Sequence, residues 1–115
     1  MATSVERRKI ALRGIRDIFD VFRKHLATSC PVHLRFVRRL PDYGQCDMDD
    51  DETNIFIVIN SSAQYTVMVD SLIHEYAHAL RMDVGDQVYG HTDDWGKAYA
   101  RVYRAYAIHV LGETE

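Results

Sequence analysis

The sequence predicts an α+β fold with an N-terminal helix, a small sheet of about three strands, a second helix and a closing C-terminal helix. In three separate stretches, apolar residues recur at spacings of three and four, as on one face of a helix. Between the first two stretches lie two segments rich in β-branched and aromatic residues. The 115 residues show no repeat, low-complexity tract or linker, so we expect a single domain spanning residues 1–115.

The first helix is expected to span residues 5–27, with Ser4 as its N-cap, because a serine hydroxyl can accept a hydrogen bond from the first turn. Gly14 weakens this helix without ending it, and Pro31 separates it from the next segment. The apolar residues expected on its buried side are Ile10, Leu12, Ile15, Ile18, Phe19, Phe22 and Leu26.

Two strand-like segments follow. Apolar and polar residues alternate in residues 32–40, which is typical of a strand with one buried face. Residues 54–60 contain a continuous apolar run, which predicts a strand buried on both faces and paired with the first as a hairpin. Residues 41–52 lie between them, contain Gly44 and the acidic run 47–52, and are expected to form a loop.

The second helix is expected over residues 65–82, which contain neither Gly nor Pro, and Gly85 follows as a stop signal. Its apolar stripe is formed by Val69, Leu72, Ile73, Tyr76, Ala77 and Leu80. His74 and His78 lie away from the centre of this stripe. We therefore expect one face of the helix in the core and both histidines on a different surface, in a cleft.

The closing helix is expected to begin at an N-cap formed by Thr92 or Asp93 and to end at Gly112. Its apolar stripe is formed by Trp95, Ala98, Tyr99, Val102, Tyr103, Tyr106 and Val110. His91 therefore stands just before a helix that packs on the core.

His74, Glu75 and His78 spell the HExxH motif of zinc metallopeptidases. Residues four apart on a helix share one face, so two imidazoles can reach a single metal ion. The carboxylate of Glu75 lies beside that face, where it can take a proton from water held by the metal. The alternative is a helix with two solvated or hydrogen-bonded histidines.

His91 is the candidate third ligand, because a catalytic zinc needs three protein ligands and one open position. It follows His78 by thirteen residues and can swing back toward the first two histidines from the start of the last helix. Asp93 and Asp94 are rival ligands. Acidic residues at the start of a helix also interact favourably with the helix dipole, so we rank His91 ahead of both.

These residues resemble the SprT-like domain, the small zincin core shared by bacterial SprT proteins and the eukaryotic protease Spartan. The matching residues are His74, Glu75, His78, His91 and Trp95. The resemblance implies a minimal zincin-like fold over most of the chain and a bound Zn²⁺. Two features differ from the family pattern. Thr92 stands where the family has a small residue, and no C-terminal zinc ribbon is expected, because the chain has only two cysteines.

The motif and the resemblance together predict a zinc-dependent metallopeptidase that hydrolyses peptide bonds of a protein or peptide substrate. His74, His78 and His91 would hold the metal, and Glu75 would be the general base for the attacking water. One alternative is a zinc-stabilised, non-catalytic binding or adaptor domain. Another is a DNA-associated protein that acts on protein–DNA complexes. Glu75 favours the enzyme over the adaptor, because a structural zinc site needs no base.

Charge is unevenly distributed along the chain. Residues 1–40 carry ten Lys or Arg against three Asp or Glu, and residues 41–115 carry four against fourteen. The basic part could bind a nucleic-acid backbone, but a pI near 6.0 does not favour this partner. We expect instead that its arginines are solvated and pair with the acidic part. The acidic run 47–52 is expected to be solvated.

No apolar run is long enough to span a bilayer and no secretory signal is recognised, so we expect a cytoplasmic protein without a membrane partner.

Cys30 and Cys46 are expected to be free thiols, although their positions near the proposed hairpin would allow them to pair.

The other histidines, His25, His33 and His109, are expected to be structural, with His25 near the dipole of a helix end. One of Tyr65, Tyr76 and Tyr89 is a candidate to face the cleft and polarise the substrate.

Overall fold

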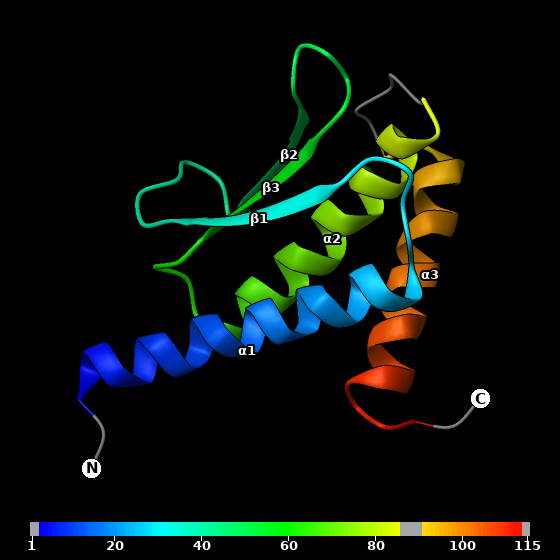
Figure 1. The fold of residues 1–115 in the computed structure, drawn as a ribbon. Helices are drawn as coiled ribbons and strands as arrows, with labels where there is room; N and C mark the ends of the chain where they lie inside the picture. Colours follow the sequence, from blue (N-terminus) through cyan, green and yellow to red (C-terminus); the bar gives the residue numbers. More distant parts are fainter. Residues whose placement is uncertain (1–2, 86–90, 114–115) are drawn as a thin grey trace.

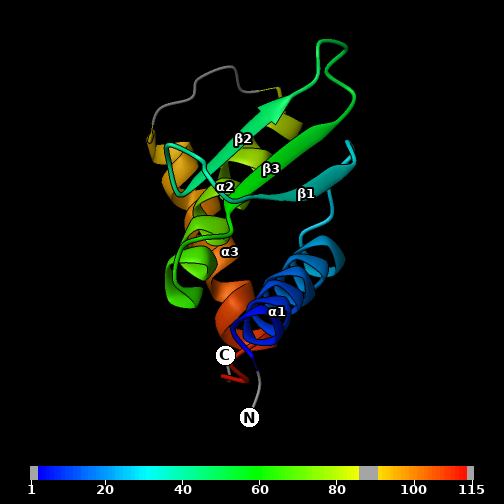
Figure 2. The same cartoon turned by 90° about the vertical axis from the view of Figure 1, so that its left-hand side faces the viewer.

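The computed structural model describes residues 3–85 and 91–113, which form three helices and one three-stranded sheet (Figure 1). The predicted α+β arrangement is confirmed, with a helix at each end of the described chain. Helices α1 and α2 lie on one side of the sheet, and α3 packs against α2 and α1 (Figures 1 and 2). No helix in the described ranges is both long and apolar enough to cross a membrane.

Helix α1 spans Ser4–His25 and is capped by Thr3, one residue before the predicted cap. The Thr3 hydroxyl oxygen accepts a hydrogen bond from the backbone N–H of Glu6 at 3.1 Å, and the hydroxyl donates to the Glu6 carboxylate at 3.0 Å. This reciprocal pair satisfies one of the free N–H groups of the first turn. The helix ends two residues earlier than predicted.

The buried face of α1 is formed by Ile15, Ile18, Phe19 and Phe22, with Leu26 just beyond the helix end. Ile10 was predicted to belong to this face, and that prediction is wrong, because its side chain is 63% exposed. At 100° per residue Ile10 lies about 130° around the helix from the centre of the buried face. Helical spacing alone did not separate the edge of the stripe from its centre.

The sheet consists of β1 (Val32–Val37), β2 (Gly44–Met48) and β3 (Ile55–Asn60), in the order β1-β3-β2. Strand β1 is shorter than predicted, because the chain turns after Val37. Strand β2 lies within the segment that was predicted to be a loop. It is short and carries a glycine, a glutamine and an aspartate, and pairing with β3 stabilises it as a strand at the edge of the sheet.

The pairing of β1 with β3 is parallel, with Val32 opposite Ile55, so the predicted hairpin between these segments is wrong. The hairpin is formed by β2 and β3, which are antiparallel, with Cys46 opposite Ile57. Its connecting loop, residues 49–54, contains most of the acidic run. The side chain of Asp49 accepts hydrogen bonds there from the backbone N–H groups of Thr53 and Asn54.

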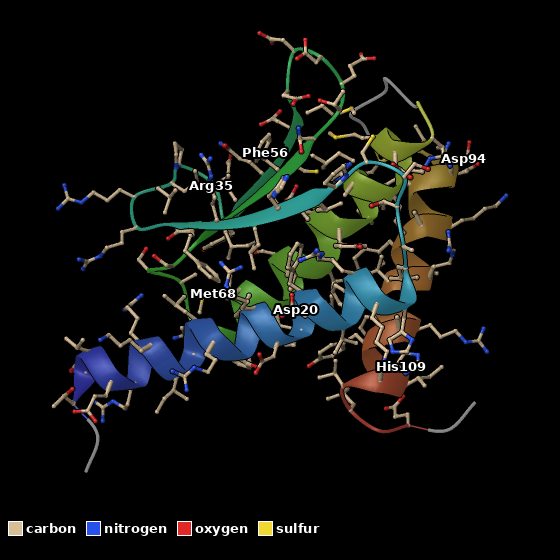
Figure 3. The ribbon with its side chains drawn as sticks, in the orientation of Figure 1. Asp20, Arg35, Phe56, Met68, Asp94 and His109 are labelled. Carbon is tan, nitrogen blue, oxygen red and sulfur yellow. The ribbon has the colours of Figure 1, made fainter. Side chains whose placement is uncertain are left out.

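Strand β3 is central, but only one of its faces is fully buried. Ile55, Ile57 and Ile59 are inaccessible, whereas Phe56 and Val58 are half-buried, so the prediction of two buried faces is wrong. The outer face is covered by polar side chains from β1. The ring of His33 stacks on Phe56 at 5.1 Å, and the guanidinium of Arg35 lies 5.4 Å from the centre of the same ring (Figure 3).

Helix α2 spans Tyr65–Asp83, close to the predicted bounds, and all six residues of its predicted apolar stripe are buried. Tyr76 is inaccessible and packs between α1 and α2, with its ring 5.3 Å from Phe22. Its hydroxyl donates to the carbonyl of Leu26 at 3.0 Å. The helix ends before Gly85, whose φ of 85° is a conformation that favours glycine.

Helix α3 spans Asp93–His109, and its N-cap is Thr92, whose hydroxyl accepts from the backbone N–H of Trp95 at 3.2 Å. The buried residues are Ala98, Val102, Ala105 and Ala107. Tyr103 and Val110 were predicted to belong to the buried stripe, but they are 50% and 37% exposed. Alanines fill the narrow interface with α1 and α2, so the larger side chains lie at its edges.

The arginines of the first forty residues do not follow the prediction that they pair with the acidic part of the chain. Within the described ranges, their one ion pair joins Arg23 to Asp20 in the same helix, at 3.8 Å. Arg16 and Arg35 instead lie over the rings of Phe36 and Phe56. Their charges remain on the surface of α1 and the outer face of the sheet.

Candidate metal centre

His74 and His78 lie one helical turn apart on α2, with their ring centres 5.0 Å apart. Both side chains are half-buried, while the residues between them, apart from Glu75, belong to the apolar core. The helix thus packs its apolar stripe against α1 and the sheet and turns the histidines toward β2 and the start of α3, in agreement with the prediction that they face a different surface.

His91 lies immediately before the N-cap of α3, and the packing of α3 on α2 brings its ring to the two histidines of α2. Its Nε2 atom is 3.2 Å from Nε2 of His74. One ligand atom from each of the three residues can be chosen so that all lie within 4.8 Å of one another. Two nitrogen ligands of a tetrahedral metal ion such as zinc lie about 3.3 Å apart, which is close to the distance between the Nε2 atoms of His74 and His91.

The protonation of the histidines also fits a metal centre. Burial, followed by the charges of His74 and His91, lowers the pKa of His78 to about 4. Burial and the neighbouring His91 also lower the pKa of His74. The imidazoles of these two residues are therefore neutral at pH 7, which is the form that binds a metal ion.

Trp95 forms one wall of the histidine cluster. The centre of its ring lies 4.2 Å from that of His91, 5.0 Å from that of His74 and 5.3 Å from that of His78. Within the described part of the chain, its buried Nε1 has no hydrogen-bond partner. The indole therefore restricts the orientations of all three imidazoles by contact.

Glu75 is 8% exposed, and its Oε2 atom is 4.0 Å from Nε2 of His74. Burial, followed by the charges of Asp47 and Asp42, raises the pKa of Glu75 to about 7. The carboxylate has no hydrogen-bond donor among the described residues, and the side chain borders the hollows beside the histidines. A carboxyl group with a pKa near neutrality is suited to exchange protons at pH 7.

Two hollows meet at Glu75. One, of about 530 Å³, lies between the loop before β2 and the first half of α2. The other, of about 490 Å³, lies between β2 and the second half of α2. Both are lined by Asp42, Gly44, His74 and Glu75, so the candidate base and one candidate ligand border both sides of the cleft.

The rival ligands Asp93 and Asp94 are not part of the histidine cluster. The Asp94 carboxylate is 3.7 Å from the guanidinium of Arg81, and Asp94 is visible at the start of α3 in Figure 3. Both aspartates lie in the first turn of α3, where they interact favourably with the helix dipole.

The remaining histidines lie elsewhere. His25 stacks on His109 at 3.6 Å, where the ends of α1 and α3 meet (Figure 3). Slight burial, followed by the charge of His109, lowers the pKa of His25. His33 shares a hydrogen bond of 2.9 Å with the side chain of Asn54. None of these three histidines belongs to the cluster of His74, His78 and His91.

None of the described tyrosines predicted as cleft candidates is in contact with the histidines. Tyr76 is in the core, and Tyr65 is 43% exposed, with its ring against Gly14. Tyr89 lies outside the described residues. Sequence reasoning missed Tyr43, which lines the larger hollow. It also missed Asp70, although the spacing of Asp70 four residues before His74 was available as a signal.

Both cysteines are free, as predicted. Cys46 is buried in β2, where its sulfur lies 3.7 Å from that of Met82, and burial raises the pKa of its thiol. It is therefore a neutral packing residue at physiological pH.

No family model and no curated protein matches this chain.

Proposed function

We propose that this chain is a zinc-dependent metallopeptidase of the SprT-like type, with His74, His78 and His91 as ligands and Glu75 as the general base. A protein or peptide is the substrate. The observation that carries the proposal is the convergence of three histidines from two separate segments beside a buried carboxylate. Two histidines at helical spacing are common. A third imidazole from another segment, with Nε2 of His91 3.2 Å from Nε2 of His74, is much less common and supports a shared metal ion.

The donor set supports zinc in particular. Three imidazoles suit a borderline-soft ion, and three protein ligands leave one position open for chemistry. When bound, zinc supplies Lewis acidity that polarises a carbonyl and makes water a stronger acid.

Glu75 is the general base and then the general acid. Its carboxylate accepts a proton from the attacking water and returns it to the leaving amine as the peptide bond breaks. The two hollows on either side of Glu75 give an extended chain room to lie across the base. Trp95 holds the imidazoles in place from the other direction.

A non-catalytic adaptor with the same zinc site is the alternative. The position of Glu75 argues against it. A buried carboxylate without a hydrogen-bond donor among the described residues costs stability, and a structural zinc site would gain nothing from it. We also propose that the protein acts in the cytoplasm, since its free cysteines fit a reducing compartment. No described contact favours a protein–DNA complex as substrate.

Elemental analysis and a single substitution test the proposal together. Purified protein should contain close to one zinc per chain, and His74→Ala or His78→Ala should remove it, while the control His33→Ala should not. Glu75→Gln should keep zinc and fold but slow cleavage of an unfolded protein substrate by about 10²–10⁴-fold. Absence of zinc after expression in zinc-replete medium rules out the site, and equal turnover by Glu75→Gln removes Glu75 from the mechanism.

A further inference from the structure

The larger of the two hollows has an acidic lining. Asp42, Asp70 and Glu75 border it, and no lysine or arginine does. Its volume of about 530 Å³ is in the range of ligand pockets in proteins. It adjoins His74 and Glu75, so any group bound in it would lie next to the reacting bond of a substrate.

The two aspartates enclose this hollow from different walls. Asp70 precedes His74 by one turn of α2, and the pair lies along one row of the helix with about 6 Å of rise between them. Asp42 lies across the hollow, in the segment that leads into β2. A cation in the hollow would therefore meet carboxylates from both sides.

The carboxylates of Asp42 and Asp70 have no partner in the described part of the protein. These side chains have no ion pair or hydrogen bond there, unlike those of Asp49, Asp83 and Asp94, which are held by donors of the chain itself. Asp83 accepts from the backbone N–H groups of Ser29 and Cys30, and Asp94 is paired with Arg81. The carboxylates of Asp42 and Asp70 are thus free to receive a partner from outside.

A second observation marks the hollow as a binding site. Glu75, whose side chain is nine-tenths buried, lines it and has no hydrogen-bond donor among the described residues. Tyr43, which is 63% exposed, and Val67 add apolar surface to the same walls. Such a lining fits a long side chain with methylene groups and a positive end.

We propose that this hollow is a specificity subsite for a lysine or arginine side chain, so that the protein selects peptides that are positively charged beside the bond to be cleaved. The inference rests on the proposed peptidase function. Asp42 and Asp70 are the specificity-determining residues, and Tyr43 contacts the methylene groups of the bound side chain.

Binding of a labelled peptide tests this without relying on turnover. The zinc-loaded Glu75→Gln protein would be titrated with fluorescein-labelled alanine-rich peptides that carry lysine, norleucine or glutamate at one central position. Norleucine preserves the methylene chain and removes only the charge. The lysine peptide should bind more tightly than the norleucine peptide, and the glutamate peptide more weakly than both.

Two double variants that change the net charge equally are compared. The test variant combines Asp42→Asn with Asp70→Asn, and the control variant combines Asp50→Asn with Asp51→Asn in the β2–β3 loop. The variant of Asp42 and Asp70 should reduce the preference for lysine about five- to tenfold, as expected for two exposed ion pairs. The control variant of Asp50 and Asp51 should leave the preference for lysine unchanged. Equal dissociation constants for lysine and norleucine, or the same loss in both double variants, would overturn the inference.

Failure of the lysine subsite and failure of the peptidase function give different results. If the lysine peptide is preferred through Asp42 and Asp70 but the protein with Glu75 intact never cleaves it, the subsite stands and the peptidase function fails. If the protein cleaves the lysine and norleucine peptides equally well, the peptidase function stands and the subsite is refuted.

Discussion

The backbone of Gly44 lies directly against the side chain of Glu75. A Cβ atom at position 44 would be 3.0 Å from Cγ of Glu75 and 3.2 Å from its Oε2 atom. Real Cβ atoms rarely approach another heavy atom so closely, so one of the two groups would have to move. Glycine at the first position of β2 therefore allows the strand to approach the candidate base.

Gly44→Ala should impair catalysis without removing the metal. The added methyl group is expected to push the Glu75 carboxylate from its position, and misplacement of a catalytic group by about 1 Å can cost up to a hundredfold in rate. We expect cleavage to fall about ten- to a hundredfold, with zinc content unchanged.

The control for this substitution is Gly96→Ala. A Cβ at position 96 meets nothing within 4 Å, and in helix α3 alanine is favoured over glycine by about 0.5–1 kcal/mol. This variant should be fully active and at least as stable as the original protein in urea unfolding. Full activity of Gly44→Ala would show that the position of Glu75 does not depend on the glycine.

His91 and Asp94 lie three residues apart but should differ in their effect on zinc affinity. His91→Ala removes one of three converging imidazoles, so we expect zinc affinity to fall by more than the 10–100-fold typical of losing an outer partner. Asp94→Asn removes only an exposed ion pair with Arg81 and should leave the affinity within about twofold. Competition with a chromogenic chelator measures both. Loss of zinc in Asp94→Asn alone would mean that the third ligand has been misassigned.

The fluorescence of Trp95 should report metal binding to the three histidines. It is the only tryptophan in the chain, and its ring lies 4.2 Å from that of His91. Indole emission responds to the groups that touch the ring, so zinc added to metal-free protein should change the emission and saturate at one equivalent. Co²⁺ should bind at the same place and quench it.

Two controls accompany this titration. Ca²⁺ prefers oxygen ligands and should have no effect. The response should disappear in His91→Ala, although Trp95 remains. A change in emission that persists in that variant would place the bound metal away from the histidine cluster.

The sequence predicted the features of this protein that arise from local pattern. Helical spacing located α2 within one residue, and the HExxH motif placed His74, Glu75 and His78 on it. His91 was found because a cap signal put it at the start of a helix that had to pack on the core. In each case the determining interactions lie within a few residues along the chain.

The features that were missed depend on distant partners. Strand β2 has a weak local preference for a strand and exists because β3 offers it an edge. The parallel pairing of β1 with β3 was not predicted, because two strand-like segments in sequence suggest a hairpin. The roles of Asp42 and Gly44 could not be foreseen for the same reason, since both depend on where β2 meets α2.

Asp49 should make the β2–β3 hairpin sensitive to acid. The hydrogen bond from the side chain of Asn54, followed by those from the backbone N–H groups of Thr53 and Asn54, lowers the pKa of Asp49 from 3.8 to about 2. A carboxyl group whose pKa is lower in the folded state stabilises that state above its unfolded pKa. This stabilisation is lost as the pH falls toward the folded pKa.

Asp49→Asn should therefore lower the free energy of unfolding near about pH 6, and its difference from the original protein should shrink as the pH falls from about 4 toward about 2. Urea unfolding over this range measures the difference, and an NMR titration of the Asp49 carboxyl carbon measures the pKa directly. Asp51→Asn is the control, because it removes the same charge from the same loop but none of these hydrogen bonds. A difference for Asp49→Asn that stays constant with pH, or a carboxyl that titrates near 3.8, would show that these hydrogen bonds do not stabilise the charged form.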